Sequence, residues 1–296
     1  MKADVFNAHG STLSMICQYK SSISYHEEAS KVYKAIYGGH HHKVAQTYNN
    51  LGIVYSHLGQ YNEAKQYYEK ALIIRKKIFG EEDADVAASY NNLGSLHAHL
   101  GQYNEAKEYH KKGLIIRKKI SGEEHAEVAV SYDNLGSLHA HLGQYNEAKQ
   151  YHEKALIIKK KIFGEDHADV AASYNNLGSL HVDLGQYNKA KQYYKKALII
   201  REKIFGEEHA DVGGSYNNLG NVHAHLGQYN EAKQYHEKAL IISKKTFGEE
   251  HADVAASYDN LGSLHAYLGQ YNEAKQYHEK ALIIKKKIYG EEHANL

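Results

Sequence analysis

Apolar residues recur along this chain at spacings of three and four, in two kinds of stretch that alternate. In residues 86–100, Tyr90, Leu93 and His97 follow this spacing, which places them on one face of a helix of about four turns. Residues 105–121 show the same spacing and predict a second apolar helix face. Together the two stretches predict a helical hairpin.

The residues between these stretches predict where each helix ends. Gly101 and Gly122 follow the two apolar stretches, and glycine readily adopts the left-handed conformation that ends a helix. Asn104 carries a side-chain oxygen that accepts a backbone N–H at a helix start. We therefore expect Tyr103 and Asn104 to form the turn into the second helix, with Asn104 as its N-cap.

The predicted hairpin returns at a constant interval of 42 residues, as the spacing of Val44 and Val86 shows. Such a period indicates stacked repeats, and repeats at the ends of an array are often atypical. The predicted units are a degenerate one at 1–43, followed by 44–85, 86–127, 128–169, 170–211, 212–253 and 254–296, the last without a capping helix.

A single hairpin of this kind cannot bury both of its apolar faces, whereas stacked hairpins bury them against each other. The repetition therefore predicts an all-α solenoid. The positions that recur resemble the tetratricopeptide repeat signature, and in the second unit they are Tyr90, Leu93, Gly94, His97, Gly101, Tyr103, Ala106, Tyr109 and Gly113.

The 42-residue length, the Asn-Asn-Leu-Gly segments and residues 71–86 look most like the repeats of kinesin light chains and nephrocystin-3-like proteins. This resemblance implies a right-handed α-solenoid of helix-turn-helix units. It also implies that the first helices line a concave groove, which binds an extended peptide or a partner segment.

One asparagine recurs on the polar side of every first helix, and its amide offers both a donor and an acceptor to a peptide backbone. These residues are Asn50, Asn92, Asn134, Asn176, Asn218 and Asn260. Their neighbours Asn91, Asp133, Asn175 and Asn217 are candidates for the same role. The alternative is that these side chains bond across neighbouring first helices and satisfy each other.

Histidine is abundant, with 23 residues in the chain. His97 and His99 are two residues apart, so their rings point to different sides of a helix and do not share a metal ion. We interpret His97 as a core imidazole bonded to a hydroxyl. The other column projects towards the groove, where mild acid is hypothesised to alter binding; it comprises His57, His99, His141, Asp183, His225 and Tyr267.

The remaining composition excludes several function classes. The 36 basic and 35 acidic residues nearly balance, so no net field favours nucleic acid or an anionic membrane. Cys17 is the only cysteine, which favours a cytoplasmic location. No catalytic motif occurs, so neither an enzyme nor a cofactor is expected.

The sequence therefore predicts a scaffold or adaptor that binds protein or peptide segments in its groove. Two alternatives stay open. One is a structural array that self-associates through its uncapped C-terminal end at His293 to Leu296. The other is the sensor array of a larger signalling or immune-type protein.

Overall fold

The computed structural model describes residues 2–15 and 18–289. Cys17 and the C-terminal end from His293 to Leu296 lie outside these residues. The described residues form α-helices joined by short connections and contain no strand, which confirms the all-α class. The helices are α1 (Lys2–Met15), α2 (Tyr19–Tyr37), α3 (His42–His57), α4 (Tyr61–Phe79), α5 (Ala84–His99), α6 (Tyr103–Ser121), α7 (Ala126–His141), α8 (Tyr145–Phe163), α9 (Ala168–Asp183), α10 (Tyr187–Phe205), α11 (Ala210–His225), α12 (Tyr229–Phe247), α13 (Ala252–Tyr267) and α14 (Tyr271–Tyr289).

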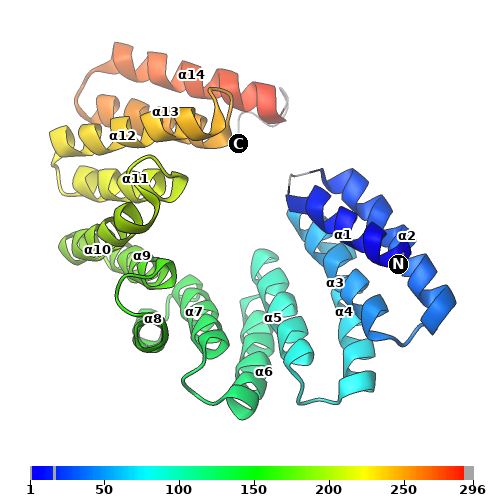
Figure 1. Cartoon of the computed structure of the whole chain (residues 1–296). Coiled ribbons are helices and arrows are strands. Elements are labelled where there is room, and N and C mark those ends of the chain that lie inside the picture. Colours follow the sequence, from blue (N-terminus) through cyan, green and yellow to red (C-terminus); the bar gives the residue numbers. More distant parts are fainter. Residues whose placement is uncertain (1, 16–17, 290–296) are drawn as a thin grey trace. The chain divides into compact units, whose positions relative to one another are not determined.

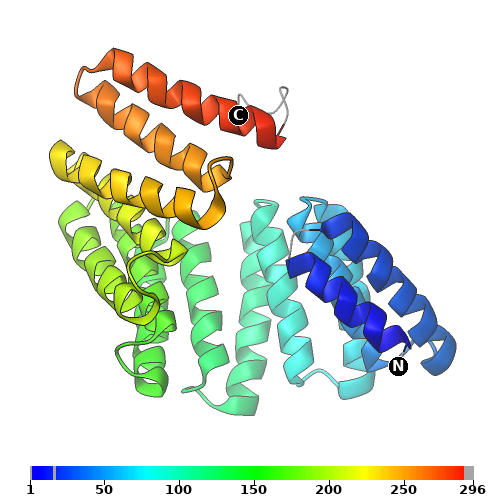
Figure 2. The ribbon, with the colours of Figure 1, turned by 45° about the horizontal axis from the view of Figure 1, so that its top comes forward.

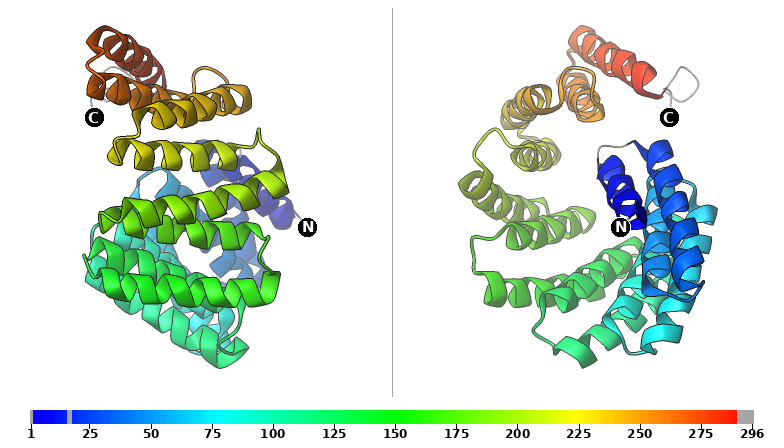
Figure 3. Two further views of the ribbon diagram at one scale, coloured as in Figure 1. Left: turned by 90° about the vertical axis from the view of Figure 1, so that its left-hand side faces the viewer. Right: turned by 45° about the vertical axis from the view of Figure 1, so that its right-hand side comes forward.

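The chain divides into two compact units, Met1–Ile158 and Lys159–Leu296, and the division falls within α8. In the first unit, consecutive helices pair as antiparallel hairpins, and each hairpin stacks on the next (Figure 1). Figure 2 shows this pairing for α1 with α2 and α3 with α4 from a second direction. In the second unit, α11–α12 and α13–α14 stack in the same way (Figure 3).

The structure confirms the two predicted glycine ends and corrects the predicted cap. Gly101 and Gly122 have φ of 71° and 79°, and each follows the end of a helix. Asn104, however, is not an N-cap, because α6 begins at Tyr103 and no side chain caps it. The backbone carbonyl of Gln102 already accepts from Ala106 N–H at 3.0 Å, so the turn closes two residues earlier than we expected.

The first helices begin with an imidazole cap that the sequence analysis did not predict. Nδ1 of His125 accepts the backbone N–H of Glu127 at 3.3 Å, and His167 caps α9 in the same way. Asp83 fills this position before α5 and accepts the N–H of Asp85 at 2.8 Å. A ring nitrogen accepts this bond only without its proton, so these caps require neutral histidine.

The two helices of a hairpin approach closely because a glycine faces an aromatic ring. A Cβ atom at Gly94 would lie 2.8 Å from the His110 ring, and one at Gly52 would lie 2.5 Å from the Tyr68 ring. Carbon atoms normally stay about 3.5–4.0 Å apart. The glycine of each described Asn-Asn-Leu-Gly or Asp-Asn-Leu-Gly segment therefore leaves the space that the ring of the second helix occupies.

We predict that Gly94→Ala destabilises the chain although alanine is the better helix former. The added methyl displaces the His110 ring at a cost of about 1–3 kcal/mol, which exceeds the gain of about 1 kcal/mol in helix propensity. Urea unfolding of the full chain, followed by circular dichroism, should show a lower midpoint.

The matched control is Gly214→Ala, which also lies inside a helix but has no atom within 4 Å of its added Cβ. This variant should unfold at the same or a higher urea concentration, since only helix propensity changes. Equal midpoint changes for the two variants would contradict the packing explanation.

Candidate functional site

The recurring asparagines of the first helices form a ladder of hydrogen bonds within each unit. In the first unit, Asn92 Nδ2 donates to Oδ1 of Asn49 and Asn134 Nδ2 donates to Oδ1 of Asn91, both at 2.8 Å. Further members are the bonds from Asn50 to Asn7, from Asn218 to Asn175 and from Asn260 to Asn217, at 3.2, 2.7 and 3.5 Å. These amides therefore bond across neighbouring first helices.

Histidines of the second helices also bond to this column of the first helices, and Nδ1 of His26, His110 and His236 lies beside the ladder acceptors Asn7, Asn91 and Asn217. His152 Nδ1 lies 2.8 Å from Oδ1 of Asp133, and His110 Nδ1 lies 3.0 Å from Oδ1 of Asn91. A carboxylate only accepts, so His152 carries its proton on Nδ1. The same geometry at Asn91 orients its amide oxygen towards both His110 and Asn134.

Hollows of similar composition lie between neighbouring first helices. One, of about 350 Å³, is lined by Ser95, His99, Asn134, Ser137 and His141, with His110 in its wall. A second, of about 310 Å³, includes Asn50, His57 and His26. A third, of about 350 Å³ in the second unit, includes His225, His236, Asn260 and Tyr267. Each hollow combines a ladder amide with a residue of the predicted groove column.

The rings of this groove column contact the tyrosines that begin the second helices, of which Tyr103 was predicted to lie in a turn. Tyr61 stacks on His99, with centroids 5.8 Å apart and planes at 2°, and Tyr103 lies 5.6 Å from His141. Tyr187 stacks on His225 at 4.6 Å, and Tyr229 stacks on Tyr267 at 6.2 Å. The tyrosine always comes from the preceding hairpin, so the stack joins two repeats. Its only sequence signal was the recurrence of tyrosine itself.

The other predicted site residues lie on α9 and α11. Asn176 and Asn175 are half-buried on α9, where Asp183 is exposed at the last position. Asn217 accepts from Asn260 and contacts His236, which places it in the ladder. The proposed pH response of the exposed histidines stays a prediction.

The buried histidine column differs from our interpretation in one respect. His97 is buried as expected, but its Nδ1 lies 2.7 Å from Oε1 of Gln102 rather than beside a hydroxyl. Its ring packs against Tyr109 with centroids 5.1 Å apart. The predicted hydroxyl partner was wrong because the Schellman-like turn after Leu100 brings the Gln102 side chain back over the ring.

Burial makes a second histidine column resist protonation. The pKa of His110 is lowered to about 4 by burial, assisted by the positive charge of Arg117. Burial lowers the pKa of His26 and of His236 to about 4 as well. The unfolded chain binds these protons near the ordinary pKa of 6.5, so acid favours unfolding between about pH 6.5 and pH 4.

We predict that His110→Tyr reduces this acid sensitivity. Tyr68 and Tyr194 occupy the corresponding place in other repeats and pack against their glycines, so the variant should fold. Between pH 6.5 and 4, the free energy of unfolding of this variant should fall less steeply with decreasing pH than that of the parent. The difference in slope should be up to roughly 1.4 kcal/mol per pH unit, which is the contribution of one proton. Urea unfolding at several pH values measures this slope.

The control is His99→Gln, because the side chain of His99 is exposed in the folded chain. It should leave the pH dependence of unfolding unchanged. If the free energy of unfolding of His110→Tyr varies with pH as that of the parent does between pH 6.5 and 4, acid destabilises the chain through groups other than His110.

Among residues 2–15 and 18–289, no group of three His, Cys, Asp or Glu side chains is placed to hold a metal ion. No helix in this part of the chain is both long and apolar enough to cross a membrane.

Comparison with known proteins gives one family and several similar structures. The family model for the tetratricopeptide repeat matches residues 2–77, 85–161, 127–203, 169–213 and 211–287. No curated protein sequence matches the chain.

Among solved structures, BtubC (BKLC) from P. vanneervenii is 25% identical, with a TM-score of 0.65, covering 77% of this chain and 91% of that one. The putative kinesin light chain from Podosopora anserina, with nearly identical TPR-like repeats, is 26% identical, with a TM-score of 0.59, covering 70% and 99%. The apo form of RapI shares the fold at 20% identity, with a TM-score of 0.71 and coverage of 97% and 99%.

Proposed function

Because the chain belongs to the tetratricopeptide repeat family and has neighbours of the kinesin light chain type, we propose that it is a non-catalytic scaffold that binds an extended segment of a partner protein on its first helices. The observation that carries this proposal is the series of hollows between neighbouring first helices, each of which contains a ladder amide. A cytoplasmic location, favoured by the single cysteine, belongs to the same proposal.

The ladder supports this function by holding its amides in place. The bond from Asn134 to Asn91 uses one N–H of Asn134, and a side-chain amide has a second N–H and an oxygen that accepts. An orientation fixed before binding reduces the entropy that binding costs. The ladder and the peptide contact are therefore compatible: one hydrogen bond orients the amide, and its remaining groups meet the partner's backbone.

The stacked rings supply the second part of the site. His99 is exposed, yet its ring lies parallel to Tyr61, so its position is restricted while one ring edge faces the hollow. Ser95 and Ser137 add hydroxyl groups between neighbouring amides. Backbone groups of an extended peptide bind such alternating donors and acceptors with little dependence on sequence. Specificity then comes from positions that vary, such as Asp183 and Tyr267.

We predict that Ser137→Tyr weakens the binding of peptides selected on the full chain from an unbiased library. The ring fills the hollow beside Asn134 and excludes the peptide backbone. Ser137 is exposed, so the thermal midpoint should stay that of the parent. Ile115→Tyr is the matched control, because Ile115 is 65% exposed on the second helix α6 and lies outside the hollow.

Asn134→Ala tests the amide itself. One lost hydrogen bond of about 1 kcal/mol should weaken binding roughly fivefold, provided that circular dichroism shows an intact fold. Peptides that bind parent, Ser137→Tyr and Asn134→Ala equally would exclude this face as the binding site.

The two alternatives from the sequence gain no support from the described residues. The predicted self-association surface at residues 293–296 lies outside them. The likeness to sensor proteins such as NprR from B. thuringiensis, at 18% identity, concerns the fold.

A further inference from the structure

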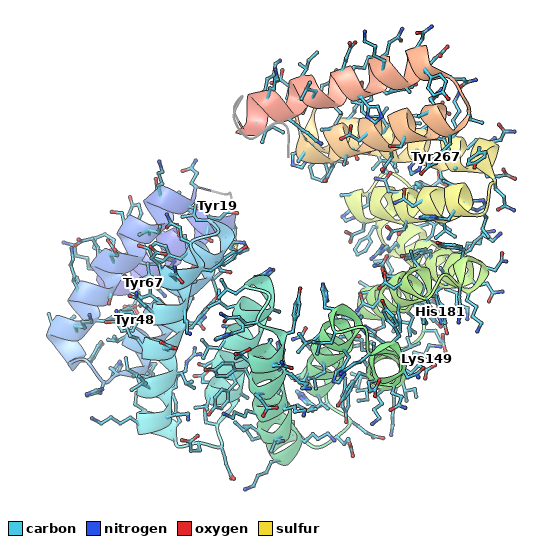
Figure 4. The ribbon with its side chains drawn as sticks, turned by 180° about the vertical axis from the view of Figure 1, so that it is seen from behind. Tyr19, Tyr48, Tyr67, Lys149, His181 and Tyr267 are labelled. Atoms are coloured by element: carbon cyan, nitrogen blue, oxygen red, sulfur yellow. The ribbon has the colours of Figure 1, made fainter. Side chains whose placement is uncertain are left out.

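The junction between the first two hairpins contains a hollow on the side of the second helices, away from the proposed peptide site. It has a volume of about 280 Å³ and lies among α2, α3 and α4. Its walls are Glu27, Ser30, Lys31, Lys34, Tyr48, Leu51, Tyr67 and Lys70. Figure 4 shows Tyr48 and Tyr67 near each other, and their ring centroids are 5.7 Å apart.

Ser30, in the wall of this hollow, stands where the later second helices carry leucine. The corresponding residue one repeat later is Leu72, which packs into the cluster with Leu93 and Tyr109. Ser30 is only 5% exposed, and its hydroxyl has no hydrogen-bond partner among the described residues. A buried hydroxyl without a partner costs free energy, so this wall of the hollow has an unused donor.

Two ammonium groups flank Tyr48 beside this hydroxyl. Lys34 Nζ lies 5.0 Å from the centre of the Tyr48 ring. Lys70 Nζ lies 5.9 Å from Tyr48 and 5.1 Å from Tyr67. The same arrangement recurs one repeat later, where Lys76 and Lys112 flank Tyr90, and in the next repeat, where Lys118 and Lys154 flank Tyr132.

In these later repeats a carboxylate of the chain itself binds the first lysine. Glu81 lies 2.9 Å from Lys76 Nζ. Glu123 Oε1 lies 2.5 Å from Lys118 Nζ and accepts from the Tyr132 hydroxyl at 3.2 Å. In the second unit, Lys160 pairs with Glu165 and Lys244 with Glu249, at 2.9 and 3.2 Å. The acid always comes from the connection that follows the second helix.

The connection after α2 lacks this acid. Gly39 and His40 occupy the positions of Glu81 and Glu82, and no carboxylate of the described residues lies within ion-pair distance of Lys34 or Lys70. Lys31 is paired with Glu28 at 2.7 Å. The wall also contains the carboxylate of Glu27. The three ammonium groups of the wall, on Lys31, Lys34 and Lys70, therefore stand against two carboxylates, that of Glu27 in the wall and that of Glu28 outside it. Counted together, these groups carry a net charge of +1.

We propose that this hollow binds the carboxylate of an acidic side chain on a partner protein. Lys34 and Lys70 pair with its oxygens, and the Ser30 hydroxyl donates a further bond. The apolar stem of the side chain packs between Leu51 and the rings of Tyr48 and Tyr67. The site thus receives from a partner the group that Glu81 and Glu123 supply within the chain.

The test uses the full chain with labelled leucine methyl groups, because Leu51 lies in the wall of the hollow. The probes are an acetylated and amidated Gly-Glu-Gly peptide, its Gly-Gln-Gly counterpart and free propionate. The glutamate peptide should shift the Leu51 methyl signals in a saturable way, and the glutamine peptide should not. Equal shifts with both peptides would overturn the proposal.

Two variants close the site by restoring residues of the later repeats, so both should fold. Ser30→Leu fills the hollow. Gly39→Glu places an acid at the position that corresponds to Glu81 in the next repeat, and an added Cβ at Gly39 has no atom within 4 Å. Each should weaken the binding of the glutamate peptide by roughly tenfold, which corresponds to the loss of one charged hydrogen bond. Unchanged binding by Gly39→Glu would contradict the proposed role of Lys34.

Lys70→Gln should weaken the binding of the peptide as well. Lys112→Gln is the matched control and should leave this binding unchanged, since Glu81 already occupies the corresponding place beside Lys76. Propionate distinguishes the source of the carboxylate. Weaker binding of propionate than of the peptide supports a protein partner. Stronger binding of propionate excludes a protein partner and identifies a small free carboxylate as the ligand.

Discussion

The close contact between a glycine of the first helix and an aromatic ring of the second is the constraint on which the other features depend. At the Gly94 contact, the ring of His110 is held near enough for its Nδ1 to donate to Asn91 at 3.0 Å. Asn91 in turn accepts from Asn134 of the next hairpin. A methyl group between the helices would separate all three groups, so the polar ladder rests on a steric fit.

The same fit accommodates two kinds of ring, and this choice changes the chemistry without changing the packing. Tyr194 packs against Gly178 as closely as His110 packs against Gly94, but its hydroxyl lies 3.0 Å from the Ser179 hydroxyl. Burial raises the pKa of Tyr194, so this ring stays neutral at physiological pH. Repeats of nearly identical backbone can therefore present either a titratable or a neutral ring beside their hollows.

The helices and their glycine ends followed from the sequence, whereas their caps did not. Among the contacts between repeats, the bonding of asparagines across neighbouring first helices was only one of two alternatives, and the tyrosine contacts were not predicted. The spacing of Tyr90 and Leu93 and the position of Gly101 predicted the helices and their ends. The cap was assigned to Asn104 because side-chain propensity carries no information on where the backbone turn closes. The ring contact of Tyr103 with His141 and the bond of Asn134 to Asn91 join different hairpins, so only tertiary structure selects them.

The ladder bonds described in both units join residues 43 positions apart, one more than the repeat length. Each donor thus belongs to one repeat and each acceptor to the preceding repeat, in the column just before the donor's own. Any two neighbouring repeats that keep these two columns present matching edges. Gene rearrangements that add or remove a whole 42-residue unit within such a series preserve its hydrogen bonds, so the number of repeats is free to change during evolution while the interface between them is conserved.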